Sequence, residues 1–95
     1  MMNFELSHIC KNWNVIKNNL FVNYYDNEFL TEDLFQIEKK NFIIDIGWYE
    51  GASLFYIYLI KDFEWDLPLI KISAYSREQC FIALEFCINY ENVLS

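Results

Sequence analysis

Few side chains in this sequence could act as a nucleophile, a base or a metal ligand. There is one histidine, His8, and there are three cysteines, Cys10, Cys80 and Cys87. A nucleophilic thiol needs a base within hydrogen-bond reach, but on a helix Cys10 would point about 200° away from His8. The Cys and His spacings of zinc sites are also missing from the sequence. We therefore expect no catalytic pair and no metal, and interpret the cysteines as reduced thiols packed in the core.

Asp45 is the carboxylate whose sequence context best suits acid–base chemistry. It stands between Ile44 and Ile46 in a predicted strand, where burial would make it a candidate acid or base. The alternative is a position on the solvent face, paired with a lysine or hydroxyl of the next strand. The two glycines, Gly47 and Gly51, complete no phosphate-binding loop. We therefore predict a protein that is not an enzyme and has no cofactor.

Two segments combine large rings with carboxylates, and such segments suit the recognition of another protein. One is the run from Asp62 to Asp66, and the other follows Gly47. Aromatic side chains anchor protein interfaces, and acidic groups steer a basic partner toward them. The predicted partner-binding residues are Asp62, Glu64, Trp65, Asp66, Trp48, Tyr49 and Glu50. The alternative is structural, with the rings in the core and the acids merely solvated.

Composition and charge narrow the choice of partner. The 95 residues match one domain, residues 1–95, and a chain that is 55% hydrophobic and 20% aromatic should be folded. This aromatic content exceeds what a small core needs, so we expect some rings at the surface or beneath a partner. With 14 acidic against 7 basic residues the formal charge is −7, which disfavours nucleic acid and anionic membranes as partners. A basic protein is the partner that this charge favours.

The first twenty residues bear on both location and fold. Polar residues interrupt Met1–Leu20 every few positions, so it matches neither a secretory signal nor a membrane span, and we expect a cytoplasmic protein. Apolar residues recur at spacings of three and four from Phe4 to Leu20, which predicts an amphipathic helix. The next stretch, Phe21–Lys40, is predicted in three parts. We expect a loop at residues 23–27 and a short helix or an irregular segment at Phe29–Gln36. The last part, Ile37–Lys40, is expected to lead into the sheet.

The remaining sequence predicts a sheet followed by a second helix. Alternating and continuous apolar patterns indicate three strands, the middle one covered on both faces: Phe42–Tyr49, Leu54–Ile60 and Leu69–Tyr75. A turn at Glu50–Ala52 joins the first two. Ser76 and Gln79 form a capping-box pattern that opens a helix to about Asn92. The predicted fold is α+β: an N-terminal helix, a three-stranded antiparallel meander and a C-terminal helix, with both helices packed on one sheet face.

Short motifs in the second half of the chain resemble a known family. They are the runs Ile44–Tyr49, Phe55–Leu59 and Trp65–Leu69 and the helix that follows Ser76. Between Phe42 and about Tyr90 the chain resembles small bacterial immunity proteins, which neutralise the toxins of contact-dependent growth-inhibition and related polymorphic toxin systems. The resemblance implies a cytosolic, non-enzymatic inhibitor that binds a cognate toxin domain, commonly a nuclease, over its active site or a neighbouring surface.

Three functions therefore remain open at the level of sequence. The first is an immunity protein that binds a toxin domain through an acidic, aromatic surface. The second is a phage-borne acidic inhibitor or nucleic-acid mimic that blocks a host defence complex, which would need acids in an extended row. The third is an oligomeric interaction module, such as a homodimer, whose mass would depend on concentration.

Overall fold

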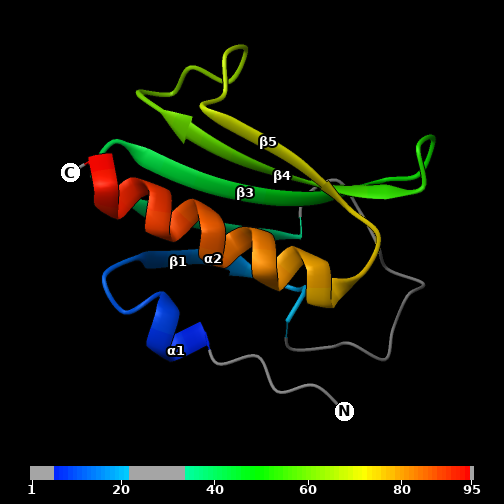
Figure 1. Cartoon of the computed structure of the whole chain (residues 1–95), viewed down its shortest axis with the longest axis horizontal. Coiled ribbons are helices and arrows are strands. Elements are labelled where there is room, and N and C mark those ends of the chain that lie inside the picture. Colours follow the sequence, from blue (N-terminus) through cyan, green and yellow to red (C-terminus); the bar gives the residue numbers. More distant parts are fainter. Residues whose placement is uncertain (1–5, 22–33, 95) are drawn as a thin grey trace.

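The fold is a five-stranded antiparallel meander with one long helix packed on it (Figure 1). The computed structural model describes residues 6–21 and 34–94. The strands stand in the order β1-β2-β3-β4-β5, the order in which they follow one another in the chain. The elements are α1 (Leu6–Ile9), β1 (Asn14–Asn18), β2 (Phe35–Lys39), β3 (Phe42–Tyr49), β4 (Leu54–Lys61), β5 (Ile70–Ala74) and α2 (Arg77–Leu94).

The core lies between α2 and one face of the sheet, here called the inner face. Because successive side chains of a strand point to opposite faces, β3 directs Ile44 and Ile46 inward, and β4 directs Ile57, the partner of Ile46, to the same side. They share one cluster with Leu84 of α2, and all four side chains are fully buried. Each contributes roughly 1.5–3 kcal/mol by leaving water. The opposite side of the sheet is called the outer face below.

The predicted N-terminal helix from Phe4 to Leu20 is wrong beyond Ile9. Among the described residues α1 covers only Leu6–Ile9, and Asn14–Asn18 forms strand β1, which pairs with β2. Apolar residues do recur at spacings of three and four in this stretch. However, Asn14–Asn18 consists largely of β-branched residues and asparagines, and both residue types are poor helix formers. As a strand, this stretch instead finds its backbone hydrogen-bond partners in β2.

The sheet has five strands and not the predicted three, because β1 and β2 extend the meander. Phe35–Lys39 is a strand, where a short helix or an approach to the sheet was predicted. Phe35 and Ile37 point inward and alternate with the half-buried Gln36 and Glu38, the pattern of a strand with one core face. The predicted loop at residues 23–27 lies outside the described residues. The predicted strands and the second helix are confirmed, with boundaries shifted by one or two residues.

Strand β4 was predicted to be covered on both faces, and this is wrong for most of its length. Its inner residues are buried, but Tyr56 and Tyr58 on the outer face are half-buried. The ammonium group of Lys71 on β5 lies 4.8 Å from the Tyr56 ring centroid and 5.8 Å from that of Tyr58. A tyrosine can bury its ring against such neighbours and keep its hydroxyl in water, so an apolar run does not require a second layer.

The predicted cap at the start of α2 is present. The backbone N–H of Gln79 donates to Ser76 Oγ at 3.1 Å, and the Gln79 side chain accepts from the backbone N–H of Tyr75 at 2.7 Å. The glutamine thus satisfies the amide of the residue before the cap, one position earlier than in the usual capping box.

Replacing Ser76 by alanine should lower the free energy of unfolding by about 1 kcal/mol, because one amide of the first turn of α2 loses its acceptor. Urea denaturation would measure the change. Ser73→Ala, at an exposed serine on β5, serves as the control and should change stability by less than about 0.5 kcal/mol. Equal losses for both variants would contradict the capping role.

No helix in the described part of the chain is long and apolar enough to cross a membrane.

Candidate functional site

The connection between β4 and β5, residues 62–69, is held at both ends by hydrogen bonds and is here called the acidic loop. At its start Asn41 Nδ2 donates to Asp62 Oδ1 at 2.7 Å, and the Asp62 amide donates to the Asn41 carbonyl at 2.8 Å. At its end the Leu69 amide donates to the Leu59 carbonyl at 2.8 Å. These bonds fix where the loop leaves and rejoins the sheet.

The acidic loop presents its rings to solvent. Phe63 is 70% exposed and Trp65 48% exposed. Asp62 and Phe63 have φ angles of 57° and 58°, in the left-handed region, which costs roughly 1–2 kcal/mol for an ordinary residue and is uncommon for a bulky one. The alternative in which both rings tuck beneath the sheet therefore does not describe this loop. Glu64 and Asp66 are also exposed, so charge and aromatic surface lie together.

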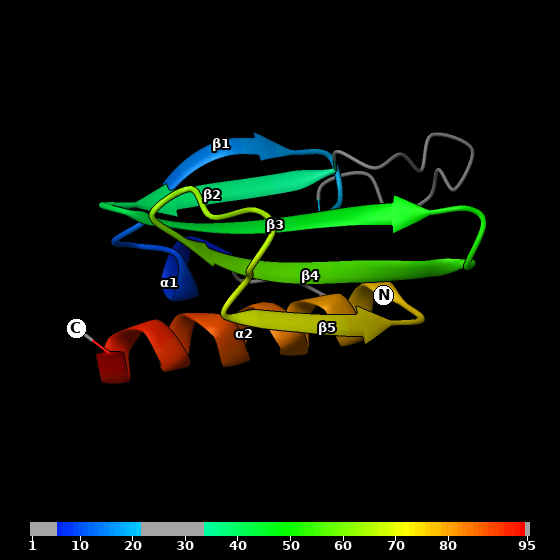
Figure 2. The ribbon, with the colours of Figure 1, turned by 90° about the horizontal axis from the view of Figure 1, so that it is seen from above.

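A small apolar cluster lies under the acidic loop. Ile43 and Ile60 face each other across β3 and β4 on the outer face, and both are buried although α2 covers the opposite face. They stand apart from the core cluster. Figures 1 and 2 show the loop rising above the sheet and running back over β3 at this end. The loop thus lies on the outer-face side of the sheet, opposite α2 (Figures 1 and 2).

The second predicted cluster is divided between the two faces of the sheet. Trp48 points inward and packs edge-on against Phe55, with ring centroids 4.9 Å apart. Tyr49 points outward and packs against Tyr56 at 5.2 Å. Glu50 is exposed in the turn that follows. Trp48 is therefore a half-buried part of the core margin, in accord with the structural alternative, and only Tyr49 and Glu50 share a side with open solvent.

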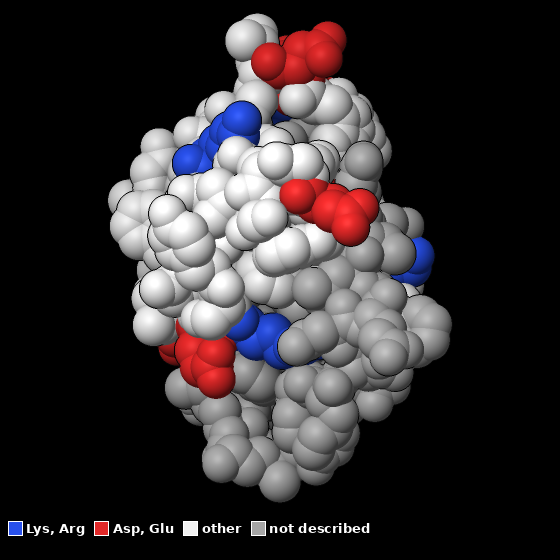
Figure 3. All heavy atoms as spheres, turned by 90° about the vertical axis from the view of Figure 1, so that its right-hand side faces the viewer, with Lys and Arg blue, Asp and Glu red and all other residues white. Residues whose placement is uncertain are grey.

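The structure does not bring the two predicted clusters together. Tyr49 pairs with Leu54 at one end of the β3–β4 hairpin, and Phe42 pairs with Lys61 at the other end, beside the acidic loop. The two ends are seven residue-to-residue steps apart along β3, roughly 24 Å at the usual rise per residue. Figure 3 views the end of the molecule that carries the turn, and the acidic side chains of the described residues form separate groups there.

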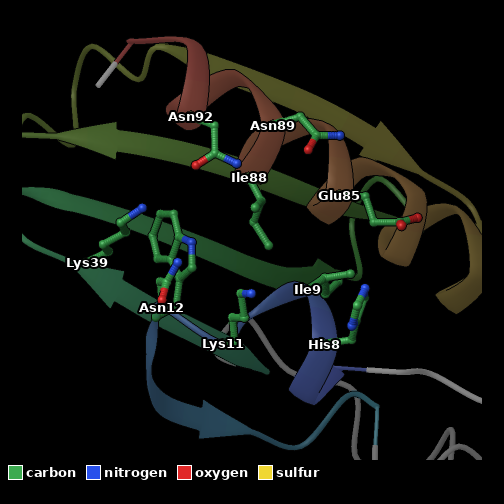
Figure 4. A pocket seen from close by; sticks show the side chains of 10 residues that line it. His8, Ile9, Lys11, Asn12, Lys39, Glu85, Ile88, Asn89 and Asn92 are labelled. Carbon is green, nitrogen blue, oxygen red and sulfur yellow. The ribbon is translucent and has the colours of Figure 1, made fainter.

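A polar cleft that sequence reasoning missed lies between α1, β2 and α2 (Figure 4). Its volume is about 240 Å³, and its lining includes His8, Lys11, Asn12, Trp13, Lys39 and Asn92. Beside it, Lys39 Nζ lies 2.9 Å from Glu91 Oε1 and 5.8 Å from the centroid of the Trp13 ring. Glu91 is 1% exposed, and among the residues that the structure describes it is the one charged residue that is buried.

The sequence did contain a signal for this buried ion pair. Glu91 follows Cys80, Leu84 and Cys87 at helical spacings of three and four, which places a carboxylate on the apolar stripe of α2. A charge on a buried stripe needs a partner. The partner, Lys39, comes from β2, a strand whose sequence assignment was unclear, so the pair could not be completed from sequence.

The three cysteines are free and buried. Burial raises the pKa of Cys10 to about 11 and the pKa values of Cys80 and Cys87 to about 12, from an ordinary value of 9.0. A thiol held neutral in this way is a poor nucleophile at neutral pH. His8 is exposed on α1, and the described residues contain no group of three or more His, Cys, Asp or Glu side chains that could hold a metal ion.

The raised thiol pKa values predict a loss of stability in alkali. Between pH 9 and about 11–12 the unfolded chain releases thiol protons that the folded chain keeps, so this contribution is present below pH 9 and is lost as the pH rises through that window. Urea denaturation at pH 7.5 and 10.5 would measure it. Cys87→Ala should reduce the slope relative to the wild type, and an unchanged slope would contradict the assignment.

No known protein family, curated protein or solved structure matches this chain.

Proposed function

We propose that this chain is an immunity protein, which binds and neutralises a cognate bacterial toxin domain through the acidic loop. The observation that carries the proposal is the exposure of Phe63 and Trp65 within a loop anchored at both ends. Three exposed acidic residues, Asp62, Glu64 and Asp66, alternate with these rings along the loop. The resemblance of Phe42 to about Tyr90 to immunity proteins points to the same function.

The geometry of the acidic loop suits tight binding. A loop that is already ordered loses less conformational freedom when a partner binds, so more of the contact energy appears as affinity. Large rings at the centre of an interface carry much of its binding energy. The formal charge of −7 accelerates encounter with a basic protein such as many nucleases. Left-handed backbone at Phe63 is the kind of local strain that clusters at binding sites.

The arrangement of charge favours a toxin domain over nucleic-acid mimicry. A mimic must present carboxylates at intervals along an extended row, in the places of phosphates. Here the acids of the loop lie at one end of the β3–β4 hairpin and Glu50 lies at the other end, and on the face in Figure 3 the acids of the described residues form separate groups with neutral and basic side chains among them. Local clusters of this kind match one interface on a protein partner.

Growth rescue would test the proposed function. The chain is expressed together with the toxin domain that is encoded beside it in its own genome, and we expect the cells to survive only when the chain is present. Trp65→Ala should abolish or strongly reduce rescue, while Val15→Ala, also exposed but on β1, should rescue fully. Growth arrest despite soluble wild-type protein would contradict the immunity function.

A further inference from the structure

Helix α2 is apolar on a second side that the sheet does not cover. Its inner residues, such as Leu84, are fully buried, yet Ile82 is 62% exposed and Phe86 is 54% exposed. These two residues lie one helical turn apart and therefore form a stripe along the helix. A helix that is apolar on more than one side is normally covered on more than one side. The exposed stripe therefore indicates a surface that a further segment covers.

The stripe borders the free edge of the sheet. Within the described chain β5 has a neighbouring strand, β4, on one side only, so its other side presents backbone groups with no strand to pair with. Between this edge and α2 lies an apolar groove of about 510 Å³ lined by Ile72, Ser73, Gln79, Ile82, Ala83 and Phe86. In Figures 1 and 2, α2 runs beneath β5 and emerges beyond its edge. A sixth strand placed beside β5 would lie over the stripe.

The edge of β5 lacks an obvious protection against strand addition. Edge strands often carry an outward lysine that prevents pairing, and β5 does contain Lys71. Its ammonium group, however, lies over the rings of Tyr56 and Tyr58 on β4, turned back across the outer face. Pro68 precedes the strand and leaves its five residues, Ile70–Ala74, with ordinary backbone amides.

From these features we infer that the groove between β5 and α2 binds an extended segment of the toxin, which pairs with β5 as a sixth strand. Alternate residues of that segment would be apolar and would pack on Ile82 and Phe86. A position at the rim would be basic, because the exposed acid Glu78 lies one helical turn before Ile82 on α2. The acidic loop also leads directly into β5, so a basic partner drawn to the loop meets the edge next. The nature of this occupant rests on the proposed function.

Affinity for the toxin domain would test the groove separately from the loop. Ile82→Lys should weaken binding at least tenfold, because a charge would enter the apolar contact. Ile16→Lys is the matched control, since Ile16 is an isoleucine of similar exposure, 50%, on the opposite edge strand β1, and binding should change less than twofold. Equal affinities of Ile82→Lys and the wild type for the toxin domain would overturn the inference that the groove binds the toxin, while leaving the proposed function intact.

Photocrosslinking in the producing bacterium would identify the occupant. A photoreactive phenylalanine analogue replaces Phe86, and the crosslinked peptide is identified by mass spectrometry. We expect a toxin segment with apolar residues at alternate positions and flanking lysines or arginines. A crosslink to a second copy of this chain, to an unrelated protein or to nothing would overturn the inference. A separate purification of the unmodified chain, with or without a bound toxin, then tests the proposed function independently of the groove.

Discussion

Replacing Lys39 by methionine is expected to lower the free energy of unfolding by about 3–5 kcal/mol, the usual cost of leaving a buried charge without its partner. Glu91 is 1% exposed on α2, and Lys39 Nζ lies 2.9 Å from its Oε1. Methionine keeps most of the lysine side-chain volume but removes the ammonium group, so the carboxylate of Glu91 stays buried without its counter-charge. Urea denaturation at neutral pH would measure the loss.

Two further variants separate the ion pair from other effects of this substitution. Lys40→Met removes an exposed lysine from the next residue and should cost less than about 0.5 kcal/mol. The double variant Lys39→Met with Glu91→Leu should recover most of the loss, because an apolar pair of similar volume often replaces a buried ion pair at little cost. A loss below about 1 kcal/mol for Lys39→Met alone would show that water reaches Glu91.

Neutralising and reversing the charge of the acidic loop should slow association with the toxin domain about 10- to 100-fold at low salt. The variant is Asp62→Asn with Glu64→Lys and Asp66→Lys. Asparagine is chosen at position 62 because its side-chain oxygen can still accept from Asn41 Nδ2, and because asparagine tolerates the φ of 57° there. The loop should therefore keep its shape while its charge changes sign. Stopped-flow kinetics would measure the association rate.

Glu50→Lys is the matched control for Glu64→Lys, a single variant of the acidic loop that changes the net charge by the same two units. It reverses an exposed acid in the turn at the opposite end of the β3–β4 hairpin, where it changes the net charge without touching the loop. We expect an association rate within about threefold of the wild type, together with a salt dependence that stays strong. If Glu50→Lys slows association as much as Glu64→Lys does, steering depends on net charge and the acidic loop has no special part in it.

Local patterns predicted the second half of the fold better than the first. Strand β3 carries a large apolar residue at every second position from Phe42 to Trp48, and α2 begins at a capping box, so both could be located from sequence. The N-terminal region was wrongly predicted to be one long helix, because apolar residues at spacings of three and four also occur by chance in a loop followed by a short strand. Pairing of β1 with β2 decides the outcome there, and such long-range pairing is not encoded in a local pattern.

The candidate site was predictable in kind but not in arrangement. Rings alternating with acids between Asp62 and Asp66 indicated an interface, and both rings of that segment are exposed. Trp48 carried the same sequence signal, yet strand alternation turns it inward against Phe55. The groove beside β5 could not be predicted, because it depends on which strand forms the edge of the sheet and where α2 crosses it.

Purification of the tagged chain from its own bacterium at low salt, with bound proteins identified by mass spectrometry, is the most direct test of the immunity function. We expect one stoichiometric partner that carries a toxin domain, released by high salt in accord with electrostatic steering. Recovery of the chain alone would contradict this function in favour of an oligomeric module, and recovery of a host nucleic-acid machine would contradict it in favour of mimicry.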